Sequence, residues 1–233
     1  MISDRPIEIA YNRNGIELTL AGVRLLALGS GALWWPDQSI LCVSDLHLGK
    51  ADRYARAGGA ALPPYQTQAT LLKLQTDLEA THAQTVICLG DSFDDQRAVV
   101  ELSEDALLWI TRLQAGRNWV WIEGNHDPAP LVGIGGTQRA TLSSTPLLFQ
   151  HIADPRCNGE ISGHYHPKLR LSTAGRAVSL ACFLCDSKRL ILPAYGAYTG
   201  GMLASHKVLK ELMEAKAVAI VTGKTPRVVP MLC

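Results

Sequence analysis

The sequence predicts an α/β fold in which parallel strands alternate with helices and carry polar residues to one edge of a sheet. Three observations lead to this prediction. The 233-residue chain is 47% hydrophobic, which is enough to bury a substantial core in one globular domain spanning residues 1–233. Short continuous apolar runs, of the length of buried strands, each end in a polar cluster. Helical patterns separate the first three of these runs.

Five apolar runs are expected to form strands that each lead into a polar motif. They lie at residues 40–43, 86–89, 119–122, 147–149 and around Ile161. A helix is expected between the first two runs, at residues 66–80, because leucines recur there at helical spacing. A second helix is expected between the next two runs, with Ser103 as its N-cap and Gly116 as its stop.

The order strand, helix, strand, helix, strand implies parallel pairing with right-handed crossovers. Loops at the carboxyl ends of parallel strands converge on one side of a sheet, so the polar motifs are expected to meet in space. The C-terminal part is expected to complete a second sheet and to include one helix at about residues 204–215. Its strand candidates are residues 178–184, 190–192, 217–221 and 228–230.

Composition and charge argue against several classes of protein, such as secreted, membrane-spanning and strongly basic nucleic-acid-binding proteins. The formal net charge is +1, so any attraction for phosphate must be local, and no strong field draws the chain to nucleic acid or to a membrane. Residues 1–6 lack the pattern of a secretory signal, so we expect a cytoplasmic location. The six cysteines are then expected to be free thiols, with Cys182 and Cys185 acting as buried small hydrophobes. The apolar stretch 18–35 is broken by Arg24 and by glycines, which favours strands over a membrane span.

The polar motifs carry the candidate chemistry. In chain order they are Asp45-x-His47, Gly90-Asp91-x-x-Asp94, Gly124-Asn125-His126-Asp127, His151 and Gly163-His164-x-His166. The chain has seven histidines, and five of them fall in these motifs. The other two, His82 and His206, are predicted to be structural or surface residues. A single histidine is more often structural than a ligand, but five at the ends of buried strands favour metal binding. Carboxylates and neutral imidazoles suit two cations that share a bridging ligand.

This ordered set resembles the five-block signature of calcineurin-like metallophosphoesterases. We therefore expect a four-layer αββα sandwich of two mixed sheets, with a dinuclear metal site at the strand ends. The resemblance implies that one ion is bound by Asp45, His47, Asp91 and His166. It implies that the other ion is bound by Asp91, Asn125, His151 and His164, with Asp91 as the bridge. Oxygen and imidazole ligands suit manganese, iron or zinc, and manganese is the first prediction.

The predicted activity is hydrolysis of a phosphodiester by a hydroxide that bridges the two metals. In the family pattern, the residue at the position of His126 contacts the phosphate and can protonate the leaving oxygen. Either Asp127 or Asp94 is expected to orient His126. Solvation or loop capping is the equally weighted alternative for Asp94.

Three further segments look like the bacterial ligase-associated DNA-damage-response endonuclease family. They are LWWP at residues 33–36, DLHLGK at 45–50 and LPAYGAYTGG at 192–201. Members of that family are small phosphoesterases encoded beside an ATP-dependent DNA ligase and a helicase. The resemblance implies a DNA substrate, a role in DNA repair, and the ligase and helicase as candidate partners.

Basic and aromatic residues near these motifs are candidates for substrate contact. Lys50, Arg53 and Arg56 are spaced by three, so on a helical turn they would share one face and could follow a phosphate backbone. A solvated basic face is the equal alternative. The tyrosines at positions 54, 195 and 198 could stack on bases, although core packing is the commoner role of an aromatic residue in an apolar stretch.

Three alternative functions use the same motifs. A nucleotide-sugar or lipid pyrophosphate hydrolase would need an apolar cleft or lid, for which we identify no sequence feature. A protein phosphatase would act on monoesters, which an assay against both ester types separates. A binding scaffold with a decayed site would lack ligands, whereas every ligand position is filled here.

Overall fold

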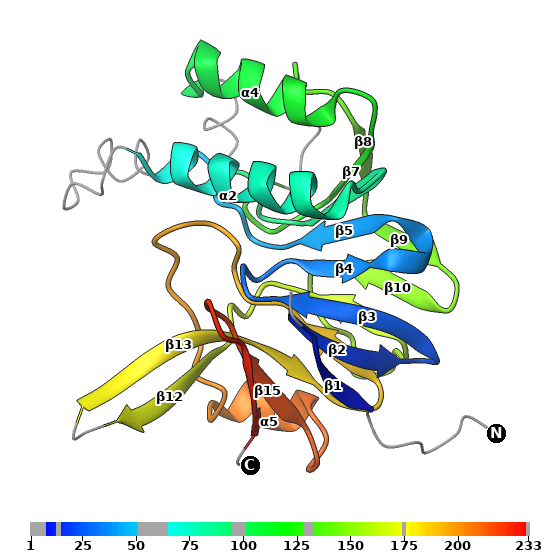
Figure 1. Cartoon of the computed structure of the whole chain (residues 1–233), viewed down its shortest axis with the longest axis vertical. Coiled ribbons are helices and arrows are strands. Elements are labelled where there is room, and N and C mark those ends of the chain that lie inside the picture. The colour runs from blue at the N-terminus through cyan, green and yellow to red at the C-terminus, as the bar shows by residue number, and fades with distance from the viewer. Residues whose placement is uncertain are drawn as a thin grey trace.

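The elements form two large mixed sheets packed face to face, with helices outside (Figure 1). The structure is a computed structural model that describes residues 8–12, 15–50, 65–94, 101–127, 133–173 and 176–231. The helices α2 (Gln66–Thr81) and α4 (Glu104–Gln114) cover the first sheet, and α5 (Lys207–Leu212) covers the second. This is the expected four-layer arrangement.

The first sheet contains eight strands in chain order. They are β1 (Ile9–Asn12), β2 (Gly15–Leu20), β3 (Val23–Leu28), β4 (Leu33–Trp35), β5 (Ile40–Val43), β6 (Thr85–Leu89), β7 (Asn118–Ile122) and β8 (Thr137–Arg139). A short 3-10 helix, η1 (Pro36–Gln38), connects β4 to β5. Strands β1 to β5 pair antiparallel and β5 to β8 pair parallel, so the predicted parallel unit is confirmed.

The second sheet has the order β16-β15-β13-β14-β11-β10-β9, and β12 pairs with β13 beside it. Its strands are β9 (Thr141–Ser144), β10 (Leu147–Gln150), β11 (Glu160–Ser162), β12 (Lys168–Thr173), β13 (Arg176–Cys185), β14 (Arg189–Ile191), β15 (Val218–Val221) and β16 (Arg227–Pro230). Strand β11 pairs parallel with both β10 and β14, and the other pairs are antiparallel.

Apolar side chains from both sheets fill the space between them. Leu18, Val120, Phe149, Ile161 and Phe183 belong to this inner core, and each is almost completely buried. Because strands β5 to β7 also pack against α2 and α4 on their other face, they are buried on both sides, as their continuous apolar sequences predicted.

Some elements differ from the prediction. Strands β1, β8, β9 and β12 are not among those predicted, because their sequences are rich in polar residues or very short. The C-terminal helix is shorter than expected, because it begins after its N-cap His206 and ends where Met213 turns extended. Cys182 and Cys185 are buried free thiols, as expected. None of the helices in the described ranges is long and apolar enough to cross a bilayer.

Replacing Phe183 by alanine tests the packing between the sheets. We expect Phe183→Ala to lower the free energy of unfolding by about 3–5 kcal/mol, because the cavity would lie between two sheets that cannot collapse onto it. Val178 lies on the same strand but is 46% exposed, so Val178→Ala should change stability by about 0.5 kcal/mol or less. Urea unfolding of both variants measures the difference, and equal effects would contradict the placement of Phe183.

Candidate metal centre

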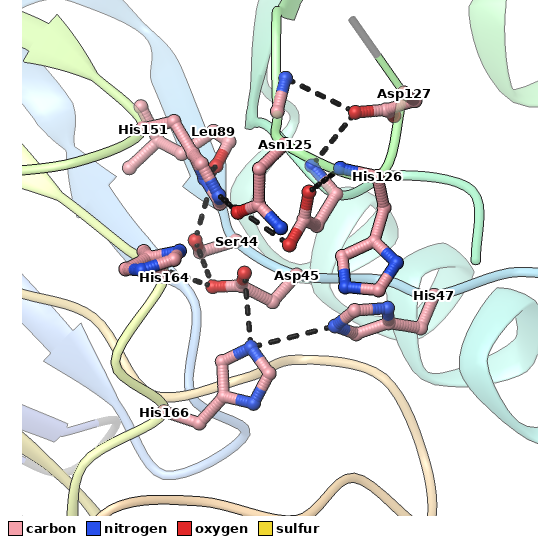
Figure 2. Close-up of polar contacts among 12 residues, drawn as sticks. Ser44, Asp45, His47, Leu89, Asn125, His126, Asp127, His151, His164 and His166 are labelled. Carbon is pink, nitrogen blue, oxygen red and sulfur yellow. Dashed lines mark hydrogen bonds and ion pairs between the residues drawn. The ribbon is translucent and has the colours of Figure 1, made fainter. Parts of the chain in front are cut away.

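The seven predicted ligands gather where strands of both sheets end, and Figure 2 shows six of them around one centre: Asp45, His47, Asn125, His151, His164 and His166. Each follows the carboxyl end of a strand: Asp45 and His47 follow β5, Asp91 follows β6, Asn125 follows β7, His151 follows β10, and His164 and His166 follow β11. Six of them form two groups whose donor atoms lie within 4.8 Å of one another. These groups are Asp45, His47 and His166, and Asp91, His151 and His164.

The first group brings two imidazole nitrogens and a carboxylate oxygen together. His166 Nε2 lies 3.0 Å from Asp45 Oδ1 and 3.4 Å from His47 Nε2. Asp45 is fully buried, and its Oδ1 has no hydrogen-bond partner among the described residues. Its other oxygen, Oδ2, accepts hydrogen bonds from Ser44 Oγ at 2.5 Å and from the His164 amide at 3.0 Å. One carboxylate oxygen is therefore held by the protein and the other is left for a ligand.

The second group is arranged in the same way. His151 Nδ1 lies 2.7 Å from the carbonyl oxygen of Leu89, which can only accept, so Nδ1 carries a proton and Nε2 is the nitrogen left for a metal. That Nε2 atom lies 3.0 Å from Asn125 Oδ1 and 3.4 Å from Asp91 Oδ2. Three electron-pair donors thus point at one another.

The separations of these donors fit a metal centre. Two ligand atoms that each lie about 2.1 Å from one ion, at octahedral or tetrahedral angles, are about 3.0 to 3.4 Å apart. The four donor pairs lie 3.0 or 3.4 Å apart. Buried lone pairs that face each other at this distance repel unless a cation or a proton lies between them. The donor set therefore fits divalent cations bound by oxygen and imidazole ligands.

Backbone strain is concentrated at the same residues. Nine residues other than glycine have a positive φ in the described part of the chain. Five of them are predicted ligands, with φ between 45° and 69°: Asp45, His47, Asp91, His164 and His166. Such conformations cost free energy in residues with a Cβ and persist where the surroundings enforce them, most often at functional sites.

Two motif glycines allow the ligand loops to touch. A Cβ on Gly163 would overlap Ser44 Oγ, and a Cβ on Gly124 would overlap the amide nitrogen of Asp91. The glycines before His164 and Asn125 are therefore required by close approach between loops from different strands.

Asp127 holds two ligand loops together through the backbone. Its Oδ1 accepts hydrogen bonds from the amides of Asp91 at 3.0 Å and Gly124 at 3.1 Å. Its Oδ2 accepts from the amides of Ser92 at 2.8 Å and Phe93 at 3.2 Å. Both oxygens are thus engaged by main chain, and the described contacts show none between this carboxylate and the ring of His126. Asp127 clamps the loop after β6 to the loop after β7.

Asp94 contacts two histidines through different atoms. Its carbonyl oxygen lies 2.9 Å from His126 Nδ1 and fixes the tautomer that leaves Nε2 of His126 for other partners. Its carboxylate Oδ1 lies 3.0 Å from His47 Nδ1, and both side chains are buried. This contact is electrostatic, because His47 Nδ1 has no hydrogen-bond partner among the described residues. A carboxylate beside the second nitrogen of a histidine strengthens the ring as a metal ligand. The backbone amide of His126 also donates to Asp91 Oδ1 at 2.8 Å.

The electrostatics keep the carboxylates ionised. Burial raises the pKa of Asp91, but the hydrogen bond and charge of His151 and the amide of His126 outweigh it and lower the pKa to about 2. Burial opposes ionisation of Asp45 too, yet nearby His166 and His151 bring its pKa below the ordinary value. Burial lowers the pKa of His164 and so favours its neutral form, whereas at His151 burial is outweighed by Asp91 and Asp45, which raise the pKa. Ionised carboxylates and neutral imidazoles are the forms that bind metal.

A polar stripe on α2 supports the first ligand loop. Gln66 donates to the carbonyl of His47 at 3.2 Å, and Thr67 Oγ1 accepts from the Gly49 amide at 3.1 Å. One turn further along, Thr70 Oγ1 accepts from the Ala197 amide at 3.0 Å. The stripe therefore fixes backbone both in the ligand loop and in the segment after β14.

Lys73 and Asp77 extend this stripe and hold Tyr195. Lys73 Nζ donates to the carbonyl of Tyr195 at 2.5 Å and lies 3.8 Å from the centre of its ring. The Tyr195 hydroxyl donates to Asp77 Oδ2 at 2.7 Å. The amide of Tyr195 then donates to the carbonyl of Ser44 at 2.7 Å, directly before the ligand Asp45. Helix α2 is thus connected to the first metal group through Tyr195.

Sequence reasoning missed these supporting residues. A signal was available, because positions 66, 70, 73 and 77 recur at helical spacing as polar residues beside the predicted apolar face of the helix. Tyr195 is fully buried, which agrees with core packing, whereas Tyr198 is 59% exposed. Lys50 is 9% exposed, and Arg53, Tyr54 and Arg56 lie outside the described residues, so the predicted basic face is not placed.

Comparisons with known proteins agree with this geometry. The family model for calcineurin-like phosphoesterases matches residues 38–186, which include every predicted metal ligand. No curated protein matches the chain. The crystal structure of nuclease MPE from Pseudomonas putida is similar, with 27% sequence identity and a TM-score of 0.67 over 95% of this chain and 100% of that chain.

Asp127→Asn tests the backbone clamp. An amide offers one acceptor oxygen in place of two and turns an NH₂ group toward backbone amides, so the free energy of unfolding should fall by about 1–3 kcal/mol. Urea unfolding in the presence of a chelator measures this without a contribution from bound metal. The matched control is Asp37→Asn, because Asp37 is 59% exposed and should tolerate the change within about 0.5 kcal/mol. Wild-type stability of Asp127→Asn would contradict the clamp.

Proposed function

Because the chain belongs to the calcineurin-like phosphoesterase family and is a metal-dependent phosphodiester hydrolase, we propose that it is a DNA endonuclease that uses two manganese ions. The observation that carries this proposal is the pair of buried donor groups, whose facing carboxylate, amide and imidazole atoms lie 3.0 to 3.4 Å apart. In the proposal one ion is held by Asp45, His47, Asp91 and His166. The other is held by Asp91, Asn125, His151 and His164, and Asp91 is shared.

Two divalent ions, when bound, supply a water that is nucleophilic at neutral pH and neutralise charge on the phosphoryl oxygens. The chain's own residues hold and orient the reactants. Asp94 positions His126 through its carbonyl, and its carboxylate lies beside the ring of His47. His126 Nδ1 donates its proton to that carbonyl, so only Nε2 can take up a second proton and pass it to the leaving oxygen. Asp127 fixes the position of the loop that carries Asp91 relative to the loop that carries His126, through hydrogen bonds to backbone amides.

A nuclease among the similar structures supports DNA as the substrate, since nuclease MPE aligns over almost the whole of this chain. The segments at 33–36, 45–50 and 192–201 support the narrower proposal of a ligase-associated repair enzyme that acts in the cytoplasm beside an ATP-dependent ligase and a helicase. Lys50, Arg53 and Arg56 remain the proposed contacts to the phosphate backbone.

A side-by-side assay tests the proposal. The purified chain is incubated with manganese and, separately, with a DNA oligonucleotide, a nitrophenyl phosphodiester, a nitrophenyl phosphomonoester and a nucleotide-sugar pyrophosphate. We expect internal cleavage of DNA and hydrolysis of the diester, both abolished by a chelator and restored by manganese. Faster turnover of the monoester or the pyrophosphate would favour a phosphatase or a pyrophosphate hydrolase instead.

Asp91→Asn tests the proposed bridge. Asp91 is assigned to both ions, so the variant should bind fewer than two manganese ions per chain and lose nearly all activity. Elemental analysis after gel filtration measures the metal content. Asp37→Asn again serves as the control, because it removes an exposed carboxylate away from the donor groups. Two ions per chain and retained activity in Asp91→Asn would overturn the assignment.

His126→Ala tests the proton donor. General acid catalysis contributes about 10² to 10⁴ in rate, and its benefit depends on how badly the leaving oxygen needs a proton. A nitrophenolate leaves readily, whereas the deoxyribose oxygen of DNA does not. The variant should therefore keep its metals and lose much more activity on DNA than on a nitrophenyl diester.

Equal losses on the two substrates would favour electrostatic stabilisation of the transition state over proton donation. A loss of bound manganese from His126→Ala would instead make this histidine a ligand. Measuring kcat/KM and metal content on the same preparations separates these outcomes.

A further inference from the structure

One residue with a positive φ in the described structure is neither a predicted ligand nor a small or polar residue of a turn or cap. Besides the five ligands, positive φ values occur at Ala21, Ser39, His82 and Tyr198. Ala21 and Gly22 form the two-residue turn between β2 and β3, where positive φ is the favoured geometry. Ser39 and His82 are left-handed C-caps of η1 and α2. Tyr198 also lies in a turn, at residues 196–199, but its φ of 57° is rare for a bulky aromatic residue.

The segment that carries Tyr198 is tied to both sides of the first metal group. On one side, the amide of Gly196 donates to the carbonyl of Asp45 at 3.0 Å. On the other side, the amide of Met202 donates to the carbonyl of Tyr165, which lies between His164 and His166, at 3.1 Å. Tyr198 is only two residues from Gly196, so its Cα lies within about 7 Å of the Cα of the residue whose amide contacts the ligand loop.

The residues on either side of Tyr198 are hydrogen-bonded to other parts of the molecule. The amide of Ala197 donates to Thr70 Oγ1 at 3.0 Å, and Lys168 Nζ donates to the carbonyl of Thr199 at 3.1 Å. The Thr199 hydroxyl also donates to the carbonyl of Gly196 at 2.9 Å, which closes the turn. The backbone on both sides of Tyr198 is therefore anchored near the loops that carry the ligands, and Tyr198 itself is 59% exposed.

An exposed aromatic ring in a strained conformation is poorly explained by folding, because glycine would occupy the turn without strain. Strained backbone that is enforced by its surroundings is most often found where a side chain must be presented. We propose that Tyr198 is a substrate-binding residue whose ring stacks on a nucleobase of the DNA next to the scissile phosphate. This inference rests on the proposed function, since it requires a substrate that carries bases. Stacking of this kind is tolerant of sequence, because every base has a π face.

The test compares two oligomers with the same sugar-phosphate backbone. One is oligothymidylate and the other carries abasic tetrahydrofuran residues in place of every nucleotide, and both are cleaved with manganese by wild type, Tyr198→Gly and Tyr198→Phe. Wild type should prefer the base-bearing oligomer in kcat/KM by about 5- to 150-fold, the range that one base–aromatic stack contributes. Tyr198→Gly should lose that preference, and Tyr198→Phe should keep it because stacking does not need the hydroxyl.

Two controls accompany the comparison. Tyr11 is 72% exposed on β1, at the edge of the first sheet away from β5 to β7, so Tyr11→Ala should keep the wild-type preference. The melting temperature of Tyr198→Gly should not fall below that of wild type, because the substitution relieves strain at a positive φ.

Any other outcome contradicts either the stacking role of Tyr198 or the choice of DNA as the substrate. A base preference that survives in Tyr198→Gly, or that is absent in wild type, overturns the stacking role while leaving the phosphodiesterase in place. A preference lost in Tyr198→Phe assigns the contact to the hydroxyl and overturns stacking, and a marked fall in the melting temperature of Tyr198→Gly assigns Tyr198 to the fold. Failure of wild type to cleave either oligomer, with the nitrophenyl diester still hydrolysed, overturns DNA as the substrate instead.

Discussion

The close approach of buried electron-pair donors is the constraint on which the rest of the structure depends. His166 Nε2 faces Asp45 Oδ1 and His47 Nε2, and His151 Nε2 faces Asn125 Oδ1, at distances where their lone pairs repel. Such an arrangement is unfavourable for folding by itself, and its stability must come from surrounding contacts and from bound cations. The clamps, the buried helix stripe and the glycines that let loops touch are all means of holding these donors together.

Each of the two sheets supplies part of the ligand set. Strands β5 to β7 bring carboxylates and Asn125 to one edge, because parallel strands end together. Strands β10 and β11 of the second sheet bring three of the histidines to the same edge. The inner core therefore acts on the site directly, since it fixes the position of the histidine-bearing loops relative to the carboxylate-bearing loops. A shift of one sheet over the other would separate the donors of both groups.

Much of this arrangement could be predicted from the sequence, for reasons that lie in the pattern of apolar residues. Runs such as residues 40–43 and 86–89 are apolar on both faces, because the second sheet covers one face and the helices cover the other. The motif that follows each run must therefore lie at the carboxyl end of a buried strand. Short polar strands such as β8 carry no such signal. The roles of Asp94 and Asp127 were open for a different reason. They depend on loops whose backbone adopts positive φ values. In such loops a carboxylate contacts amides or a histidine of another loop, and these contacts cannot be deduced from the order of residues in the sequence.

The segment after β14 combines two requirements that conflict elsewhere in proteins. A residue that contacts substrate must be exposed, and exposed loops are usually mobile. A contact that aligns a reacting bond must also be fixed, because a displacement of about 1 Å is enough to cost 10²-fold in rate. Here the backbone on both sides of Tyr198 is hydrogen-bonded to the ligand loop, to α2 and to β12, while the ring itself remains exposed. The metal groups and the proposed base contact thus share one set of supports, so any change that loosens those supports must affect metal binding and substrate alignment together.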